Sequence, residues 1–91
     1  MLTLERVKEL LEYDPESGLW TWRSDLNSRG YNRPRKIAGS LHYVYGYIEI
    51  RIDKQSYRSH RLAWLYMTGE WPRHQVDHIN LCPADNRWSN L

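Results

Sequence analysis

The residue pair best suited to chemistry in this chain is an aspartate followed by a histidine, Asp77 and His78. A carboxylate is a hard oxygen ligand for a divalent metal ion, and an imidazole is a general base for a water molecule. On an extended backbone, neighbouring side chains point to opposite sides, so the aspartate can hold the metal while the histidine faces the water. The alternative is a surface pair in a turn, because such short motifs often occur by chance.

The elements that must position this pair are short. Thr3 is a candidate cap for a helix over residues 4–13, which turn-forming residues 14–18 then end. A short strand is predicted over residues 19–23. Residues 24–36 are polar, basic and interrupted by Gly30 and Pro34, which predicts a loop.

The clearest strand covers residues 43–53, where Ile48, Ile50 and Ile52 alternate with polar or aromatic residues. A turn at 53–55 leads to a partner strand over 56–59. Residues 60–68 form helix-favouring sequence that stops at Gly69. A last strand over 75–79 would carry Asp77 and His78, and a polar loop follows. The predicted fold class is therefore a small α+β domain: an N-terminal helix, an antiparallel hairpin or sheet, and a central helix.

Composition limits the possible classes of protein. The chain has 91 residues, enough for one domain, with five Trp, seven Tyr and no Phe. A single cysteine, Cys82, excludes an internal disulfide and a multi-cysteine zinc site, and it favours an intracellular compartment. No apolar run approaches the roughly 20 residues of a membrane span, and the N-terminus does not resemble a signal peptide. We expect a cytoplasmic domain without a membrane partner.

Charge is uneven along the chain. Residues 1–25 hold six acids and three bases, residues 26–62 two acids and eight bases, and residues 63–91 three acids and two bases. A basic stretch rich in arginine and tyrosine is the expected electrostatic footprint of nucleic-acid binding. A solvated face on a nearly neutral protein is the other interpretation. The basic residues of the middle stretch are Arg29, Arg33, Arg35, Lys36, Arg51, Lys54, Arg58 and Arg61.

Several segments together resemble the HNH endonucleases of bacteriophages, which include homing-type enzymes. The most specific segments are 60–64 (HRLAW), 68–72 (TGEWP), 76–80 (VDHIN) and 85–91 (DNRWSNL). Segments 10–18 (LLEYDPESG), 38–40 (AGS) and 46–47 (GY) are similar to the front half of those proteins, so the resemblance covers nearly the whole chain.

The resemblance implies a ββα unit that holds one divalent metal ion, most commonly Mg²⁺ and alternatively Mn²⁺, against a phosphate of DNA. By this resemblance Asp77 is the metal ligand and His78 the general base. Asn90 is the middle residue of the family motif, whose amide braces the loop. The third motif position, a further metal ligand, belongs to a helix beyond Leu91. The motif is therefore incomplete, which leaves three explanations: a shortened sequence, a naturally short relative, or a site completed by a partner chain.

The resemblance divides the chain into residues 1–59, with the helix, sheet and basic loop, and residues 60–91, with the partial HNH motif, inside one compact domain. Arg87 either contacts a phosphate or braces its loop. His60 is expected to be a packed histidine. Trp20 and Trp22 share a strand face and are expected to pack. The candidate DNA-binding residues are Arg29, Arg33, Arg35, Lys36, Arg51, Arg58, Arg61 and Arg87.

Two functions remain in competition. The first is metal-dependent hydrolysis of DNA phosphodiesters by Asp77 and His78. The second is a catalytically silent relative that binds DNA or inhibits a protein partner. A purely structural domain is the least favoured, because it leaves the joint spacing of Asp77, His78 and Asn90 as coincidence.

Overall fold

The computed structural model describes residues 2–23, 36–41 and 46–91, and every structural statement below concerns these residues. The candidate DNA-binding residues Arg29, Arg33 and Arg35 lie outside them. The described elements, in chain order, are α1 (Leu4–Leu10), β1 (Leu11–Tyr13), β2 (Trp20–Trp22), β3 (Ile37–Ala38), β4 (Ser40–Leu41), β5 (Ile48–Ile52), β6 (Gln55–Arg58), α2 (Ser59–Thr68) and a 3₁₀ turn, η1 (Trp88–Asn90).

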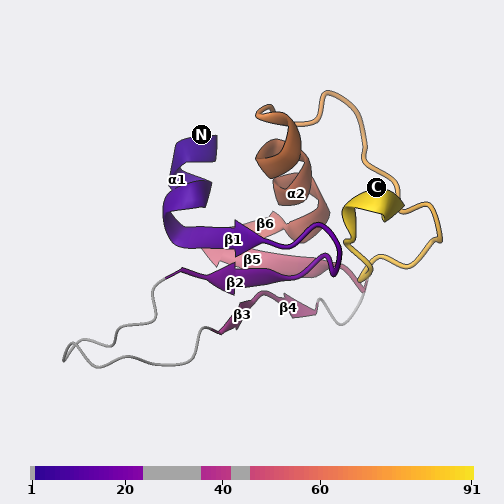
Figure 1. The fold of residues 1–91 in the computed structure, drawn as a ribbon, viewed down its shortest axis with the longest axis horizontal. Helices are drawn as coiled ribbons and strands as arrows, with labels where there is room; N and C mark the ends of the chain where they lie inside the picture. The colour runs from indigo at the N-terminus through magenta and orange to yellow at the C-terminus, as the bar shows by residue number, and fades with distance from the viewer. Residues whose placement is uncertain (1, 24–35, 42–45) are drawn as a thin grey trace.

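Two antiparallel three-stranded sheets, β1-β2-β3 and β4-β5-β6, lie beneath the two helices (Figure 1). Gly39 separates β3 from β4 and has a φ of 106°, a conformation that L side chains rarely adopt. A Cβ added there would lie 2.8 Å from Cγ2 of Ile48. This glycine therefore lets the chain pass from one sheet to the other while it contacts β5. The α+β class predicted from the sequence is confirmed.

The first helix is shorter than predicted. Thr3 Oγ1 accepts a hydrogen bond from the backbone N–H of Arg6 at 3.3 Å, as expected of an N-cap. The helix ends at Leu10, however, and residues 11–13 form a strand paired with β2, so the prediction of a helix to residue 13 is wrong. Leu11 and Tyr13 are both buried with Glu12 exposed between them, which is the period of a strand.

The hairpin and the second helix form as predicted, except that β5 is shorter than the strand predicted over residues 43–53. Residues 46, 47 and 53 lie outside β5, and residues 43–45 lie outside the described part of the chain. β5 and β6 pair in register around a two-residue turn, Asp53 and Lys54, with φ values of 50° and 70°. Positive φ values at both positions are typical of a type I′ turn, whose twist matches that of the flanking strands, although neither residue is a glycine. Helix α2 ends at Gly69, whose φ is 83° and whose N–H donates to the carbonyl of Leu65.

The core lies between the helices and the sheets. Its largest fully buried side chains include Trp20, Ile50 and Leu62, each no more than 1 % exposed. Trp22 and Trp88 pack against this core from its edge, which fits the expectation that the tryptophans serve packing. In the described part of the chain, the helices are too short and too polar to cross a membrane.

The C-terminal part of the chain has little regular structure. The strand predicted over residues 75–79 does not form there, and this prediction is wrong. This segment forms no strand pairing with another described segment. A backbone hydrogen bond joins it to η1, from the N–H of Ile79 to the carbonyl of Asn90 at 2.8 Å. In Figure 1 this segment and η1 lie beside α2 and the turn between β1 and β2. The site residues are thus carried by a loop.

Candidate active site

Residues 76–78 present their side chains alternately inward and outward. Val76 and His78 are buried, each 8 % exposed, whereas Asp77 between them is exposed. Asp77 and His78 nevertheless line one cleft of about 430 Å³. The other residues lining it are Tyr47, Gln75, Val76, Leu81 and Pro83. A carboxylate and an imidazole therefore share one open cleft.

The imidazole of His78 has a defined partner. Its Nε2 lies 2.8 Å from Oδ1 of Asn86, whose side chain is buried. An amide oxygen only accepts hydrogen bonds, so Nε2 carries the proton in this contact. In the neutral ring the other nitrogen, Nδ1, is then unprotonated and free to accept a proton. This is the tautomer that a general base acting through Nδ1 requires.

A second histidine packs against the first. The ring centroids of His60 and His78 are 4.8 Å apart, and Tyr47 stacks on His60 at 5.5 Å. Burial, with contributions from His78, Arg58 and Arg61, lowers the pKa of His60 to about 4. His60 is therefore neutral at pH 7 and adds no positive charge beside His78. The packed role expected for it from the sequence agrees with these contacts.

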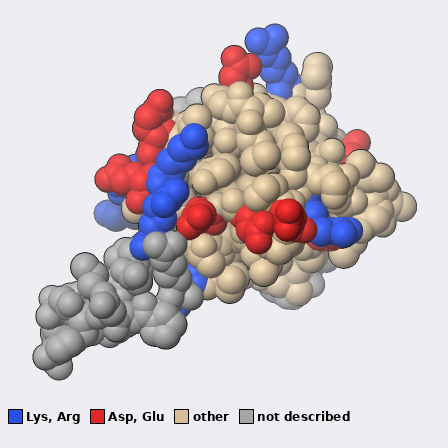
Figure 2. Space-filling model, viewed as in Figure 1, with Lys and Arg blue, Asp and Glu red and all other residues tan. Residues whose placement is uncertain are grey.

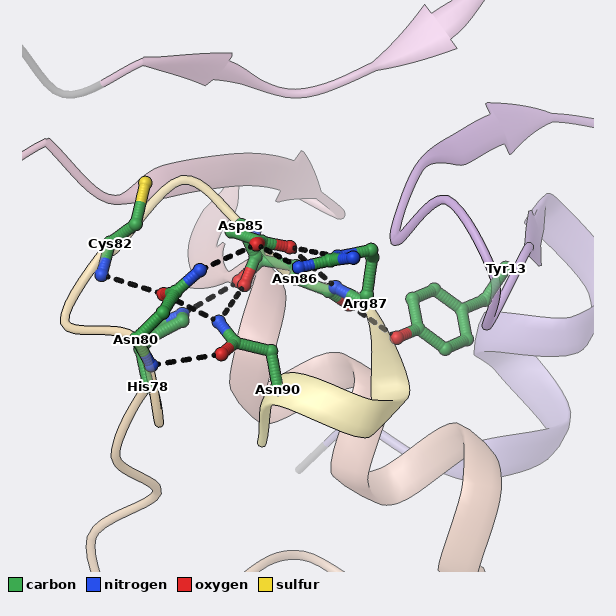
Figure 3. A network of polar contacts seen from close by, with 8 residues as sticks. All are labelled: Tyr13, His78, Asn80, Cys82, Asp85, Asn86, Arg87 and Asn90. Carbon is green, nitrogen blue, oxygen red and sulfur yellow. Dashed lines mark hydrogen bonds and ion pairs between the residues drawn. The ribbon is translucent and has the colours of Figure 1, made fainter.

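Asn90 joins the two ends of the loop that follows His78 (Figure 3). Its Oδ1 accepts from the backbone N–H of Asn80 at 3.0 Å. Its Nδ2 donates to Oδ1 of Asn80 at 3.0 Å and to the backbone carbonyl of Asp85 at 2.8 Å. The oxygen and the nitrogen of the buried Asn90 amide are thus both hydrogen-bonded within this loop, which assigns Asn90 a structural role there.

Arg87 makes the contacts of a loop brace. Its Nε and Nη2 donate to the two carboxylate oxygens of Asp85 at 2.8 and 2.7 Å. These bonds, with one from Asn80 Nδ2, hold the pKa of Asp85 well below its ordinary value. The planar fork of Arg87 is occupied by this pair. A phosphate contact by Arg87 stays a prediction.

Sequence reasoning missed the contact between the β1–β2 turn and the site loop. The hydroxyl of Tyr13 donates a short hydrogen bond to the backbone carbonyl of Asn86, and the N–H of Trp88 donates to the carbonyl of Pro15 at 2.9 Å. A Cβ added at Gly18 would lie 2.3 Å from the backbone N of Arg87. The turn-forming residues 14–18 are the part of the sequence that makes this contact, but their composition predicts only the end of a helix.

The remaining candidate DNA-binding residues are dispersed. The guanidinium of Arg58 lies 4.4 Å from the ring centroid of Tyr47, which lines the cleft. The pairing of Glu49 with Arg58, and of Arg51 with Ser56, places Arg51 and Arg58 on the same face of the β5–β6 hairpin.

Two other predicted residues lie elsewhere. Arg61 lines a separate groove with Tyr57 and Trp71, and Lys36 is exposed where β3 begins. On the face drawn in Figure 2, the described basic side chains lie near the margins with acidic ones beside them. The described basic side chains therefore do not form a single patch on that face.

Asp77 is chemically suited to a divalent cation. Among the residues that the structure describes, no hydrogen bond or ion pair engages its exposed carboxylate. Within the same residues there is no cluster of three or more His, Cys, Asp or Glu side chains arranged to hold a metal. Mg²⁺ suits such a site, because it keeps several waters and is commonly held by one or two carboxylates together with phosphate oxygens.

The loop thus brings a carboxylate and an imidazole, the groups that metal-assisted hydrolysis uses, to one cleft braced by buried amides. Comparison with protein families gives the particular family: a model described as HNH endonuclease matches residues 57–91. Over these residues the chain matches the HNH endonuclease family model, which confirms the resemblance seen in its motifs. Residues 1–56 lie outside the match. No curated protein and no solved structure matches the chain.

Proposed function

We propose that this protein hydrolyses phosphodiester bonds of DNA with the help of a divalent metal ion, at the cleft lined by Asp77 and His78. The observation that carries the proposal is the contact between His78 Nε2 and Asn86 Oδ1 at 2.8 Å, in a cleft that the exposed Asp77 also lines. The family match to residues 57–91 supports the same activity.

His78 would act as the general base. Its Nδ1 takes a proton from the water molecule that attacks phosphorus, while the bond between phosphorus and the bridging oxygen breaks. The leaving oxygen is protonated from solvent. A divalent cation at Asp77, Mg²⁺ or Mn²⁺, would supply electrostatic stabilisation of the phosphate and the leaving oxygen. His60 packs against His78 and, because its ring is neutral at pH 7, places no positive charge next to the base.

The test is nicking of supercoiled plasmid DNA with Mg²⁺ or Mn²⁺, and with a chelator as the negative control. We expect His78→Ala to lower the nicking rate about 10²–10⁴-fold, the usual contribution of a general base. His74→Ala is the matched control, since His74 is an exposed histidine that does not line the same cleft. A His78→Ala variant that nicks as fast as the parent would show that His78 is not the base.

A second candidate function is DNA binding without hydrolysis. It is favoured by Arg58, whose guanidinium lies over the Tyr47 ring at the cleft and is exposed. In this case the parent chain retards DNA in a gel without nicking it, and binding weakens steeply as salt is added. Arg58→Gln should weaken binding, whereas Arg73→Gln, a control at an exposed arginine on another segment, should change it less.

The biological setting belongs to the same proposal. The sequence resemblance points to a phage-type or homing-type enzyme that acts in the cytoplasm of an infected or prophage-carrying bacterial cell. Nicking of the DNA of such a host, or of a competing phage, is the activity to examine there.

A further inference from the structure

We propose that Tyr13, at the end of β1, and the turn that follows it position the general base, by a chain of two contacts that runs from Tyr13 through Asn86 to His78. Asn86 sets which ring nitrogen of His78 carries the proton, and Tyr13 holds Asn86 in place. The effect on catalysis rests on the proposed function, but the effect on the ring proton of His78 does not.

The first contact is between side chains. Asn86 is 3 % exposed, and its Oδ1 lies 2.8 Å from Nε2 of His78. His78 is itself 8 % exposed, so water has little access to replace this partner. A ring with two nitrogens has two neutral tautomers, and one buried acceptor beside Nε2 is enough to select between them.

The second contact fixes the backbone of Asn86. The Tyr13 hydroxyl donates to the carbonyl of Asn86 across 73 positions of sequence. Tyr13 is rigid, since it is 4 % exposed and its ring packs on Trp20 at 4.8 Å and on Tyr66 at 5.9 Å. Burial raises the pKa of Tyr13 to about 12, so the phenol remains a donor through the physiological range.

Two further features of the turn hold the same backbone. The carbonyl of Pro15 accepts from the N–H of Trp88 at 2.9 Å, two residues past Asn86. Gly18 has a φ of 76° and approaches so closely that an added Cβ would lie 2.3 Å from the backbone carbon of Asn86. The turn is therefore fitted against residues 86–88, and Asn86 cannot move without the turn.

These positioning residues lie outside the matched family domain. Tyr13, Pro15 and Gly18 belong to residues 1–56, whereas His78 and Asn86 lie within residues 57–91. A positioning role explains why three separate features of an N-terminal turn converge on the backbone beside the one side chain that contacts His78. Apolar packing alone does not require the Tyr13 hydroxyl that donates to this backbone.

The test is the ring N–H signal of His78 in a ¹H–¹⁵N spectrum of the full chain without DNA. In the parent we expect a visible Nε2–H signal, because a buried, hydrogen-bonded ring proton exchanges slowly with water. Asn86→Ala should lose the signal, whereas Asn86→Asp, which keeps an acceptor oxygen, should retain it. Dispersed backbone amide signals in each variant establish that it is folded.

The role of Tyr13 is tested by removing one hydroxyl. Tyr13→Phe should keep the signal but raise its exchange rate about tenfold, the change expected from weakening one hydrogen bond. Tyr66→Phe is the matched control, since Tyr66 packs in the same aromatic cluster and should leave the rate unchanged. Equal rates in the two variants would overturn the role of Tyr13. A ring signal that persists in Asn86→Ala would overturn the role of Asn86.

Nicking assays then connect positioning to catalysis. Asn86→Ala should lower kcat about 10–100-fold with KM unchanged, which is typical when an outer partner of a functional histidine is removed. If the parent does not nick DNA, the proposed function fails while the spectra still decide the positioning role. If the parent nicks DNA and the spectra do not change between variants, only the positioning role fails.

Discussion

The core and the site loop of this molecule are stabilised in different ways. Around Trp20, Ile50 and Leu62 most buried side chains are apolar, and strand ladders satisfy the backbone of β1, β2, β5 and β6. In residues 76–91 the buried side chains include His78, Asn86 and Asn90, and single hydrogen bonds replace ladders. Damage to the core should therefore act on the whole fold, whereas damage to the loop should act locally on geometry and activity.

The largest effect is expected in the core, from Trp20→Ala. Trp20 is 1 % exposed and contacts both Tyr13 and Tyr66, so its truncation leaves a large cavity. We expect a loss of about 3–5 kcal/mol in the free energy of unfolding. For a chain of 91 residues this is a large share of a typical stability. Urea unfolding followed by tryptophan fluorescence and circular dichroism measures it.

The comparison is with Leu19→Ala at the neighbouring position. Leu19 is 52 % exposed, and its truncation should cost far less. Similar losses for the two variants would mean that the region around Trp20 is not the rigid core described here.

A smaller and more local effect is expected in the loop, from Asn90→Ala. This change removes three hydrogen bonds, to the backbone N–H of Asn80, to its side chain and to the carbonyl of Asp85. We expect about 1–3 kcal/mol of destabilisation, since buried partners are left unsatisfied. The specific readout is hydrogen exchange: the amide of Asn80 should exchange much faster, while amides in β5 should change little.

Ser89→Ala serves as the matched control, because Ser89 is the exposed neighbour of Asn90. Faster exchange spread evenly over the whole chain in Asn90→Ala would contradict a local role and make the loop part of the core's cooperative unit.

Local patterns in the sequence were sufficient for the elements that depend on neighbours in the chain. The alternation of Ile48, Ile50 and Ile52 predicted β5, and Gly69 predicted the end of α2. Alternation of burial across Val76, Asp77 and His78 also agrees with the extended backbone that was expected, although no partner strand is present among the described residues. The family resemblance supplied the roles of Asp77, His78 and Asn90, which stay predictions.

Patterns that depend on distant partners were not predictable in this way. Leu11 and Tyr13 fit both a helical stripe and a strand, and their pairing with Trp22 and Trp20 decides between the two. β3 and β4 have only two residues each, too few for any periodicity. Nothing local in the sequence shows that the side chain of Asn86 reaches His78, eight positions earlier in the chain.

The smallest effect is expected far from the site, at the ion pair between α1 and the hairpin turn. Arg6 donates to both carboxylate oxygens of Asp53, at 3.0 and 2.9 Å, and this pair lowers the pKa of Asp53. Because the pKa of Asp53 is lower in the folded than in the unfolded chain, the ion pair stabilises the fold above about pH 4, the usual pKa of an aspartate in the unfolded chain. This stabilisation is lost as the pH falls through the lower pKa of Asp53 in the folded chain. Both side chains are substantially exposed, at 40 and 53 %, so the contribution is small and weakens with salt.

Asp53→Asn isolates this contribution, because asparagine tolerates the φ of 50° at this position. We expect the variant to be slightly less stable than the parent at pH 7, with a difference that shrinks as the pH falls below about 4, in thermal unfolding at low salt. Arg6→Gln should reduce the pH-dependent difference between the parent and Asp53→Asn, because the two side chains act as one pair. A difference that does not shrink as the pH falls would assign the effect to the turn backbone. The ion pair would then contribute nothing to joining α1 to the core, and apolar packing alone would account for that contact.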